Sequence, residues 1–432
     1  MPKRAGFFIV IFAALLFTLP QTATAQDGDG YISYRFKRGD TLIGIANRYF
    51  RKPGLYRIVQ RRNRISDAKR IRVGRTIRIS RSFLKFRRSQ ARLVSVRGRV
   101  LRSGRVAKGG DVIREGASLS TAASSFVSLA LEDGSTISLP SNSSMRIRRL
   151  RRYVLGGSLD YDFAVSRGGV RSKVSPKRSR DDRYRVRSPR AVSAVRGTDF
   201  QTRYDEAANR DYAEVIEGGL EVGMADNHKV AVESGNGLAV NSSGQFAIET
   251  LRPAPDLQNP GRTQSAPLVK FAAAPASGSA GQRYTLAADA GFTDMIADAK
   301  VNGQTASFSD IPNGNYFIRV RAISETGMEG LPATFAFKRR LNSVKASAGA
   351  ADDGFAFKWS AVGGGVQRYH FQLFKDSKDS AALIDEVGIE ENRIAISDLS
   401  PGEYYWRVGV VQYLDGEAAT SWTSFEKITL SQ

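Results

Sequence analysis

Side chains that commonly carry out acid–base or metal chemistry are few in this sequence of 432 residues. The chain has no cysteine and two histidines, His228 and His370, which stand 142 positions apart. This spacing offers neither a Ser/His/Asp constellation nor a run of metal ligands. A glycosidase would need two carboxylates held on either side of one bond, but the 42 Asp and Glu residues are scattered over predicted turns and strand edges. We therefore predict no catalytic residue, no metal and no cofactor, and expect that the protein is not an enzyme.

Positive charge is the chemical property that the sequence has in excess. The formal net charge is +23, and it is divided unevenly along the chain. Residues 31–200 contain 42 Lys and Arg against 11 Asp and Glu, a net charge of +31, whereas residues 201–432 contain 21 against 29, a net charge of −8. A polycation of this kind attracts polyanions such as nucleic acid, anionic lipids and anionic cell-wall polymers. The charge therefore predicts a polyanionic partner. Which polyanion it is depends on the compartment in which the protein acts.

The first 25 residues have the pattern of a secretory signal peptide. Lys3 and Arg4 precede an apolar run over residues 6–19, and Ala23-Thr24-Ala25 fits the small-residue cleavage pattern. The apolar run is short for a membrane span, so an uncleaved anchor is the weaker alternative. We expect cleavage after Ala25 and export to the periplasm or cell envelope. Export excludes nucleic acid as a partner, and the lack of cysteine excludes disulfides and lipid attachment at an N-terminal cysteine.

Residues 31–80 show the pattern of two strands that flank two short helices. Residues 34–37 alternate aromatic and cationic side chains, as in a half-buried strand, and Gly39 supplies a turn. Asn63 is expected to close the second helix in a left-handed conformation, and residues 71–79 alternate as a returning strand. Apolar residues at helical spacing form a first stripe of Leu42, Ile45, Ala46 and Tyr49 and a second of Leu55, Ile58 and Val59.

This arrangement resembles the LysM domain. The matching residues are Arg38-Gly39-Asp40-Thr41-Leu42, Ile45-Ala46, Asn63 and Val73-Gly74-Arg75-Thr76-Ile77-Arg78-Ile79. LysM domains bind glycans that contain N-acetylglucosamine, in a shallow groove between the loop after the first strand and the loop after the second helix. The resemblance implies a glycan-binding groove formed by Gly39, Asp40, Thr41, Leu42, Asn63, Arg64 and Ile65. Peptidoglycan is the expected glycan because the envelope supplies it.

Several of these groove residues also have a structural interpretation. Asp40, Thr41 and Asn63 can each cap a helix, in which case backbone groups of the two loops would contact the N-acetyl group. Ile43 stands where LysM domains often have an aromatic ring, so a stacking contact with the sugar is missing. Residues 34–80 hold 15 Lys and Arg but two Asp. We predict that these cations contact the carboxylates of peptidoglycan stem peptides or another anionic envelope polymer.

Residues 91–245 are predicted to form an all-β domain, because short apolar runs alternate with turn signals such as Asp133-Gly134 and Gly218-Gly219. The order of the runs resembles the FecR domain. The matching stretches are Val94-Ser-Val96, Gly98, Gly110-Asp111, Gly116, residues 131–139, Pro189-Arg-Ala191, Val195-Arg-Gly-Thr-Asp-Phe200, residues 215–222 and Gly235-Asn-Gly237. The most specific of these stretches is Arg196-Gly-Thr-Asp-Phe200. Within it we expect an ion pair between Arg196 and Asp199 and a backbone role for Gly197.

The best-known FecR relatives use this domain as the envelope half of a signal transducer, together with a membrane helix and a cytoplasmic segment. This sequence shows neither pattern, so we expect a β-domain that senses or scaffolds. The basic residues 171–190 are interpreted as a solvated loop that runs into a strand. Contact with an anionic polymer is the alternative interpretation.

The last third of the chain contains an internal repeat. Residues 309–321 align with residues 397–409 at an offset of 88, and both segments carry a turn followed by alternating aromatic and apolar residues. The pattern resembles fibronectin type III and predicts two β-sandwich domains, over residues 281–340 and 341–432. Residues 253–280 are rich in Pro, Ala and Ser and are predicted to be a linker.

The sequence thus predicts a multidomain, mainly β protein: a signal peptide (1–25), a small βααβ LysM module (31–80), a FecR-like β domain (91–245), a linker, and two sandwiches. The predicted function is a non-enzymatic envelope scaffold that holds peptidoglycan through the LysM module. The alternative is a periplasmic sensor or regulator of envelope signalling that acts through the FecR-like domain.

Overall fold

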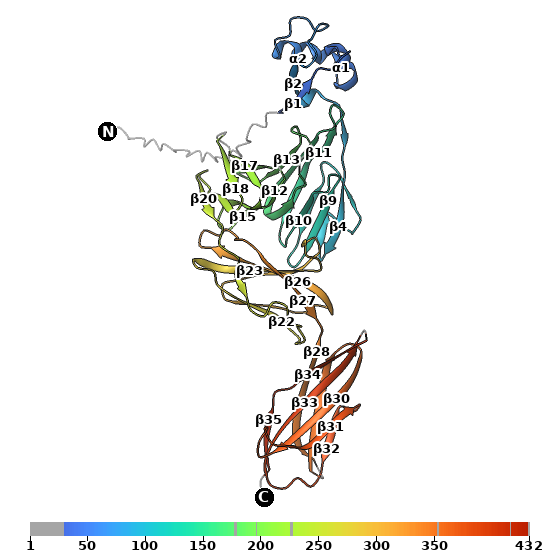
Figure 1. Ribbon diagram of the computed structural model, residues 1–432, viewed down its shortest axis with the longest axis vertical. Helices are drawn as coiled ribbons and strands as arrows, with labels where there is room; N and C mark the ends of the chain where they lie inside the picture. The colour runs from blue at the N-terminus through green and yellow to red at the C-terminus, as the bar shows by residue number, and fades with distance from the viewer. Residues whose placement is uncertain are drawn as a thin grey trace, which may run out of the picture.

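The computed structural model describes residues 30–176, 179–195, 197–224, 228–351, 354–414 and 416–430, so the predicted signal peptide lies outside the described residues. The described chain is mainly β, as predicted, and its domains follow one another along one long axis, with the helical module at one end and the last sandwich at the other (Figure 1). Within the described ranges, none of the helices is long and apolar enough to cross a membrane.

The N-terminal module has the predicted βααβ order. Its elements are β1 (Tyr31–Arg35), α1 (Leu42–Tyr49), the 3₁₀ turn η1 (Pro53–Leu55), α2 (Tyr56–Arg62) and β2 (Thr76–Ser80). β1 and β2 pair as an antiparallel ribbon. The apolar stripe of α1 faces this ribbon, so that Leu42, Ile45 and Ala46 are buried against Ile77 and Ile79.

The core of this module extends beyond residue 80. It includes Leu84, which follows a second 3₁₀ turn, η2 (Arg81–Phe83), and it is closed by Tyr153 and Leu155 of the middle domain. Tyr153 packs edge-on against Phe86, with the ring centroids 6.2 Å apart. The module is therefore joined to the middle domain by shared apolar core and not by a free linker.

The middle domain consists of two antiparallel-rich sheets that share one long strand. The first sheet has the order β6 (Arg105–Val106), β5 (Val100–Arg102), β8 (Ser118–Thr121), β11 (Ser144–Tyr153), β12 (Leu159–Lys173), β13 (Arg183–Arg187), β14 (Ala191–Val195), β17 (Gly219–Met224) and β18 (Lys229–Glu233), and β3 (Phe86–Arg88) also pairs with β11. The second sheet has the order β7 (Val112–Ile113), β4 (Ala91–Arg97), β9 (Phe126–Leu131), β10 (Thr136–Leu139), β12, β15 (Asp199–Asp205), β16 (Arg210–Glu217), β19 (Asn236–Val240) and β20 (Phe246–Thr250).

Strand β12 passes from one sheet to the other at Gly168. The residues before Gly168 pair with β11 and β13, and the residues from Gly168 onward pair with β15. Gly168 has φ +64°, and a Cβ at this position would lie 2.7 Å from the carbonyl oxygen of Asn142. The crossing therefore requires glycine.

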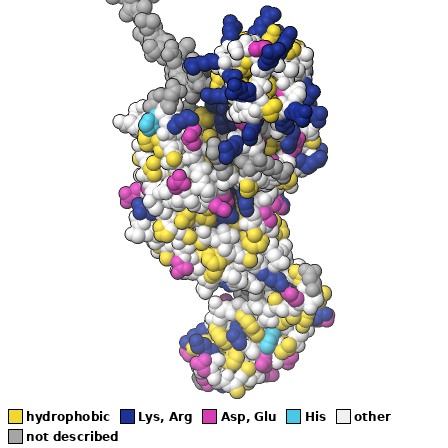
Figure 2. Space-filling view, turned by 45° about the horizontal axis from the view of Figure 1, so that its top comes forward, with side chains coloured by type: hydrophobic (Ala, Val, Ile, Leu, Met, Phe, Trp, Pro, Cys, Tyr) yellow, Lys and Arg dark blue, Asp and Glu magenta, His cyan; other side chains and the backbone are white. Residues whose placement is uncertain are grey.

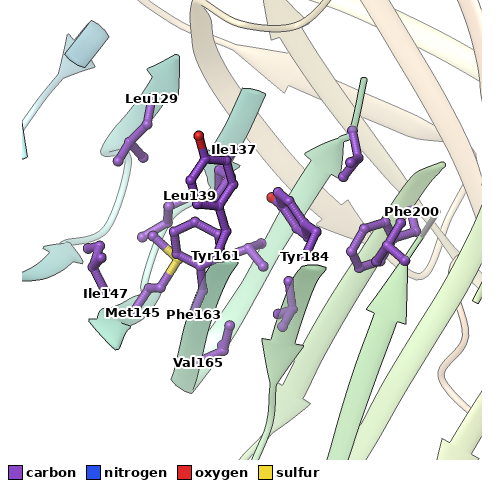
Figure 3. Close-up of a cluster of buried hydrophobic side chains, with 14 of the residues drawn as sticks. Leu129, Ile137, Leu139, Met145, Ile147, Tyr161, Phe163, Val165, Tyr184 and Phe200 are labelled. Atoms are coloured by element: carbon purple, nitrogen blue, oxygen red, sulfur yellow. The ribbon is translucent and has the colours of Figure 1, made fainter. Parts of the chain in front are cut away.

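The core of the middle domain lies between these two sheets. Tyr161 and Phe163 of β12, Tyr184 of β13 and Phe200 of β15 point into it, together with aliphatic side chains of β9, β10 and β11 (Figure 3). The ring centroids of Phe163 and Tyr184 are 5.4 Å apart, and those of Tyr184 and Phe200 are 6.4 Å apart. These contacts bind strands from both sheets into one core.

The first sandwich begins earlier in the chain than the sequence indicated. Its two sheets are β21 (Asp256–Leu257), β22 (Val269–Ala274) and β25 (Thr305–Phe308), and β24 (Met295–Val301), β23 (Ser279–Ala287), β26 (Gly314–Ser324) and β27 (Ala333–Arg339). Val269, Phe271 and Ala273 of β22 are buried in its core. The segment 253–280 is thus not a linker as predicted. Its Pro, Ala and Ser content obscured the alternation of Val269, Phe271 and Ala273, which is that of a half-buried strand.

The second sandwich has the same strand order. Its sheets are β28 (Asn342–Ala351), β29 (Gly354–Gly363) and β32 (Arg393–Ile396), and β31 (Ala382–Ile389), β30 (Val366–Lys375), β33 (Gly402–Leu414) and β34 (Glu417–Trp422), with β35 (Glu426–Leu430) also paired to β33. The repeated segments fall on β26 and β33, the central strands of the larger sheets. Tyr404, Trp406 and Val408 are buried in the core, as their alternation predicts.

Candidate functional site

The first loop of the predicted groove, after β1, is held by its own side chains. Asp40 accepts a hydrogen bond from the hydroxyl of Tyr34 (2.6 Å) and one from the backbone N–H of Lys37 (2.8 Å). Burial opposes ionisation of Asp40, but these hydrogen bonds outweigh it and hold the pKa of Asp40 below its ordinary value. Gly39 supplies the left-handed turn, with φ +85°.

Thr41 is the N-cap of α1. Its hydroxyl oxygen accepts a hydrogen bond from the backbone N–H of Gly44 (3.0 Å). Leu42, the next residue, is fully buried, and its backbone N–H donates to the carbonyl oxygen of Ala68 (3.2 Å). This hydrogen bond joins the loop after β1 to Ala68, in the segment that follows α2.

The second loop is fixed to β2 by Asn63. The side-chain amide of Asn63 donates to the carbonyl oxygens of Val59 (2.8 Å) and Arg78 (2.9 Å), and its oxygen accepts from the N–H of Arg78 (2.7 Å). Asn63 has φ −100°, and the left-handed residue is Arg64, with φ 50°. The predicted left-handed Asn63 is therefore wrong, because its amide is held against β2 and the chain turns one residue later.

The seven predicted groove residues divide into two groups. The side chains of Asp40, Thr41, Leu42, Asn63 and Ile65 are engaged inside the module, whereas Gly39 and Arg64 are exposed. What these loops offer to a glycan is their backbone, the guanidinium of Arg64 and the half-buried side chain of Ile43. The groove itself stays a prediction.

Two residues that the sequence reasoning missed stabilise the second loop. Gln60 donates from its amide to the carbonyl oxygens of Ile65 (3.1 Å) and Ser66 (3.2 Å). Arg75 donates to those of Asn63 (2.9 Å) and Arg64 (3.2 Å). Arg75 lies in the stretch 73–79 that resembles the LysM domain. Its position as a cation next to a turn was the sequence feature that could have identified it.

The cations of the module form its surface. All 15 Lys and Arg of residues 34–80 are exposed, and they gather on the module at the top of Figure 2. They are Arg35, Lys37, Arg38, Arg48, Arg51, Lys52, Arg57, Arg61, Arg62, Arg64, Lys69, Arg70, Arg72, Arg75 and Arg78. We call this set the cationic cap. Its density creates a field that attracts polyanions and weakens with added salt.

The cationic cap continues onto the middle domain. Arg87 and Arg88 of β3 lie directly opposite Arg152 and Arg151 of β11 in the antiparallel ladder. Like charges opposite one another destabilise a sheet. Arg151 is balanced by Glu115 (2.5 Å), which leaves the exposed Arg87 and Arg88 to extend the positive surface.

The structure describes only part of the FecR-like stretch at residues 195–200. Arg196 lies outside the described residues, so its predicted pair with Asp199 cannot be placed; Asp199 forms an ion pair with Arg171 (2.7 Å). Gly197 has φ +73°, and a Cβ there would lie 3.2 Å from Cα of Pro176, which fits the predicted backbone role. In the basic segment 171–190, β13 buries Arg185 and Arg187 against Asp162, at 3.0 and 2.9 Å.

The histidines are far apart in the fold as well as in the sequence. His228 stacks on Phe246 of the middle domain, with centroids 5.4 Å apart, and His370 pairs with Asp385 in the last sandwich. Among the described residues, no group of three His, Cys, Asp or Glu is arranged to hold a metal ion.

Comparison with family models identifies two domains in the chain. Residues 34–80 match the model of the LysM domain, and residues 117–221 match the model described as FecR protein. The chain therefore carries a LysM domain followed by a FecR domain, as the sequence resemblance indicated. Both are families typical of envelope proteins. No curated protein matches this chain.

Solved structures share low similarity with parts of the chain. A putative anti-sigma factor from Parabacteroides distasonis has 18% identity over 31% of this chain and 59% of its own, with a TM-score of 0.26. A two-domain fibronectin type III segment of chicken tenascin has 11% identity over 40% of this chain and 98% of its own, with a TM-score of 0.21. Fibronectin(III)-like modules of Clostridium thermocellum CbhA have 14% identity over 41% and 94%, with a TM-score of 0.19. The topology of the two sandwiches is shown by their strand pairing.

Proposed function

We propose that this protein is an exported, non-enzymatic component of the cell envelope that binds peptidoglycan through its LysM domain and presents the FecR domain and the two sandwiches as a scaffold. The observation that carries the proposal is the LysM domain at residues 34–80, since domains of this family generally bind glycans containing N-acetylglucosamine. Export after cleavage at Ala25 is part of the proposal.

The cationic cap supports a second contact beyond the neutral sugar. A shallow groove that lacks an aromatic ring at Ile43 offers little stacking area, whereas 15 exposed cations offer a strong long-range attraction to carboxylates or phosphates of an envelope polymer. Binding is then expected to have a salt-insensitive part from the groove and a salt-sensitive part from the cap.

The test is co-sedimentation of the full-length protein with purified sacculi over a salt series. Deletion of residues 31–80 is a poor control, because it would uncover Leu84, Tyr153 and Leu155. We prefer Ser66→Trp, which places a bulky ring on the exposed surface of the second loop, and Asn47→Trp as a matched change on the exposed side of α1. Ser66→Trp is expected to lower retention at high salt, and Asn47→Trp to leave it unchanged.

Two results would count against parts of the proposal. Equal retention of the two tryptophan variants at high salt would remove the groove as the binding site. Retention of the unaltered protein that does not change between low and high salt would remove the role of the cationic cap. Release of soluble fragments from sacculi by the purified protein would contradict a non-enzymatic role.

The FecR domain at residues 117–221 favours one alternative function, regulation of envelope signalling. In that case the middle domain would contact a protein of the inner membrane. Cross-linking in cells distinguishes the two functions, because a scaffold yields envelope-structural neighbours and a regulator yields a specific inner-membrane partner.

A further inference from the structure

The junction between the middle domain and the first sandwich is built from buried and half-buried charged side chains. Glu329, which follows β26, lies at its centre and is 2% exposed. On the sandwich side it contacts Arg283 (3.2 Å) and Arg321 (3.5 Å). On the middle-domain side it contacts Arg203 (3.8 Å) and accepts a hydrogen bond from the amide of Gln201 (3.1 Å). One carboxylate is thus shared by cations of two domains.

The charges around Glu329 do not balance. The group contains five arginines and four acids, a net charge of +1: Arg171, Arg203, Arg283, Arg319 and Arg321 against Asp199, Glu214, Asp298 and Glu329. Arg319 lies in the group without an acid of its own, since its guanidinium stacks on Phe292 at 3.6 Å and its Nε donates to the hydroxyl of Thr334 (3.2 Å). A buried excess of positive charge is costly unless an anion accompanies it.

A cavity of about 50 Å³ lies inside this group. Four of the five arginines line it, together with Gln201 and Glu329, and Phe292 and Met295 form an apolar wall. A water molecule needs roughly 10–15 Å³ measured in this way, so the space accommodates an ion larger than water. We call this space the junction cavity.

Two of the arginines that line the junction cavity, Arg171 and Arg321, each have a buried guanidinium nitrogen without an acceptor among the described residues. Nε of Arg321 and Nη1 of Arg171 are buried and find no hydrogen-bond acceptor among the residues that the structure describes. The side chain of Arg321 is 5% exposed, and its Nη1 already donates to Oε1 of Gln201 (2.7 Å). Buried N–H groups are almost always satisfied in native proteins, so two such donors beside one cavity indicate an acceptor that the protein does not supply.

We propose that the junction cavity binds a small inorganic anion of the halide class, which accepts from Arg321 and Arg171 and locks the first sandwich onto the middle domain. The excess positive charge favours an anion, and the small volume of the cavity limits the size of that anion. The apolar wall of Phe292 and Met295 favours an ion that is weakly hydrated. The site lies far from the LysM groove and is independent of glycan binding.

The test is thermal unfolding of the full-length protein in sodium chloride, sodium bromide and sodium gluconate at constant ionic strength. A ligand that binds the folded state raises the unfolding temperature in a saturable manner. Chloride and bromide are expected to raise the unfolding temperature with saturation, whereas gluconate, which is too large for the cavity, has no such effect. The same unfolding temperature in all three salts would overturn the proposal.

Three variants assign the effect to this cavity. Arg321→Met is expected to lose the difference between chloride and gluconate. If Arg321→Met does not fold, Thr285→Asp serves instead, because Thr285 lines the cavity and a carboxylate there replaces the anion; it too is expected to abolish the chloride effect. Arg97→Met is the matched control, since Arg97 pairs with Asp294 (2.8 Å) at the exposed rim of the same junction. It is expected to lower stability but keep the chloride effect.

Crystals soaked in bromide supply a direct readout. A bromide peak within hydrogen-bond distance of Nε of Arg321 would support the proposal. Bromide peaks confined to the protein surface would identify an adventitious ion only and would overturn it, as would a chloride effect that persists unchanged in both Arg321→Met and Thr285→Asp.

Discussion

The cationic cap and the junction between the middle domain and first sandwich use arginine in opposite ways. All 15 cations of the cap are exposed, whereas at the junction Arg321 is buried and Arg203 and Arg283 are half-buried beside Glu214 and Glu329. Exposed charges contribute little to stability and act at long range, while buried ones are costly unless each has a partner. The net charge of +23 therefore combines two sets of arginines, an exposed set on the LysM domain and a set that joins two domains.

The largest expected effect comes from removing the shared acid of the junction. Glu329→Gln removes the carboxylate that Arg203, Arg283 and Arg321 share, while Glu214 and Asp298 still pair with Arg203 and Arg283, so we expect the free energy of unfolding to fall by about 3–5 kcal/mol. Calorimetry or circular dichroism measures the loss. Because all three Trp residues lie in the last sandwich, their fluorescence is a separate probe that should move less. Glu206→Gln, at an exposed site, is the control, and an equally small effect of both would show that the junction is not held by charge.

Lowering the pH should destabilise the same junction. Burial alone would raise the pKa of Glu329, but Arg283, Arg203 and Arg321 together lower it to about 2. Since this folded-state pKa lies below the ordinary value of about 4.3, the stabilisation by Glu329 is present above pH 4.3 and is lost as the pH falls through 2. Unfolding measured from pH 6 to pH 2 should therefore show a steeper loss of stability for the unaltered protein than for Glu329→Gln. If stability falls with pH equally in the unaltered protein and in Glu329→Gln, the negative charge assigned to Glu329 is contradicted.

A smaller effect is expected in the LysM domain. Thr41→Ala removes the N-cap of α1 and should lower the stability of this domain by about 1 kcal/mol. Hydrogen exchange of the α1 amides measures the change locally. Thr76→Ala, at an exposed position of β2, is the matched control and should change exchange of α1 much less.

The smallest effect on stability is expected from the cap itself. The triple change Arg35→Gln, Arg38→Gln and Arg72→Gln removes three exposed cations and should alter the free energy of unfolding by less than about 0.5 kcal/mol. Retention on sacculi at low salt should nevertheless fall, and its dependence on salt should become weaker. A large loss of stability would show that the cap, like the junction, is structural.

Sequence patterns predicted the elements whose periodicity is local. The helical stripe of α1, the alternation of Tyr404, Trp406 and Val408, and the strand order of the LysM domain follow from one stretch of chain each. The linker prediction was wrong because the Pro, Ala and Ser residues around β22 resemble a flexible segment and obscured the alternation of Val269, Phe271 and Ala273. Composition does not show which residues of such a segment pack against distant strands.

The glycan-binding groove stays a prediction, but the structure shows how its two loops are held. Asn63 ties α2 to β2, and Arg64 makes the left-handed turn that was predicted at Asn63. The junction cavity was not predicted at all. Its arginines come from β12, β23 and β26, and nothing in their local sequence distinguishes a buried guanidinium from an exposed one.

The path of strand β12 through both sheets affects how the middle domain resists proteolysis. Because its first part pairs in one sheet and its last part in the other, the melting of either sheet frees one end of β12 and uncovers the core between the two sheets. We therefore expect the two sheets to melt together, without a half-open form whose bare sheet edge would favour cleavage and self-association. Degradation of this domain should be an all-or-none event.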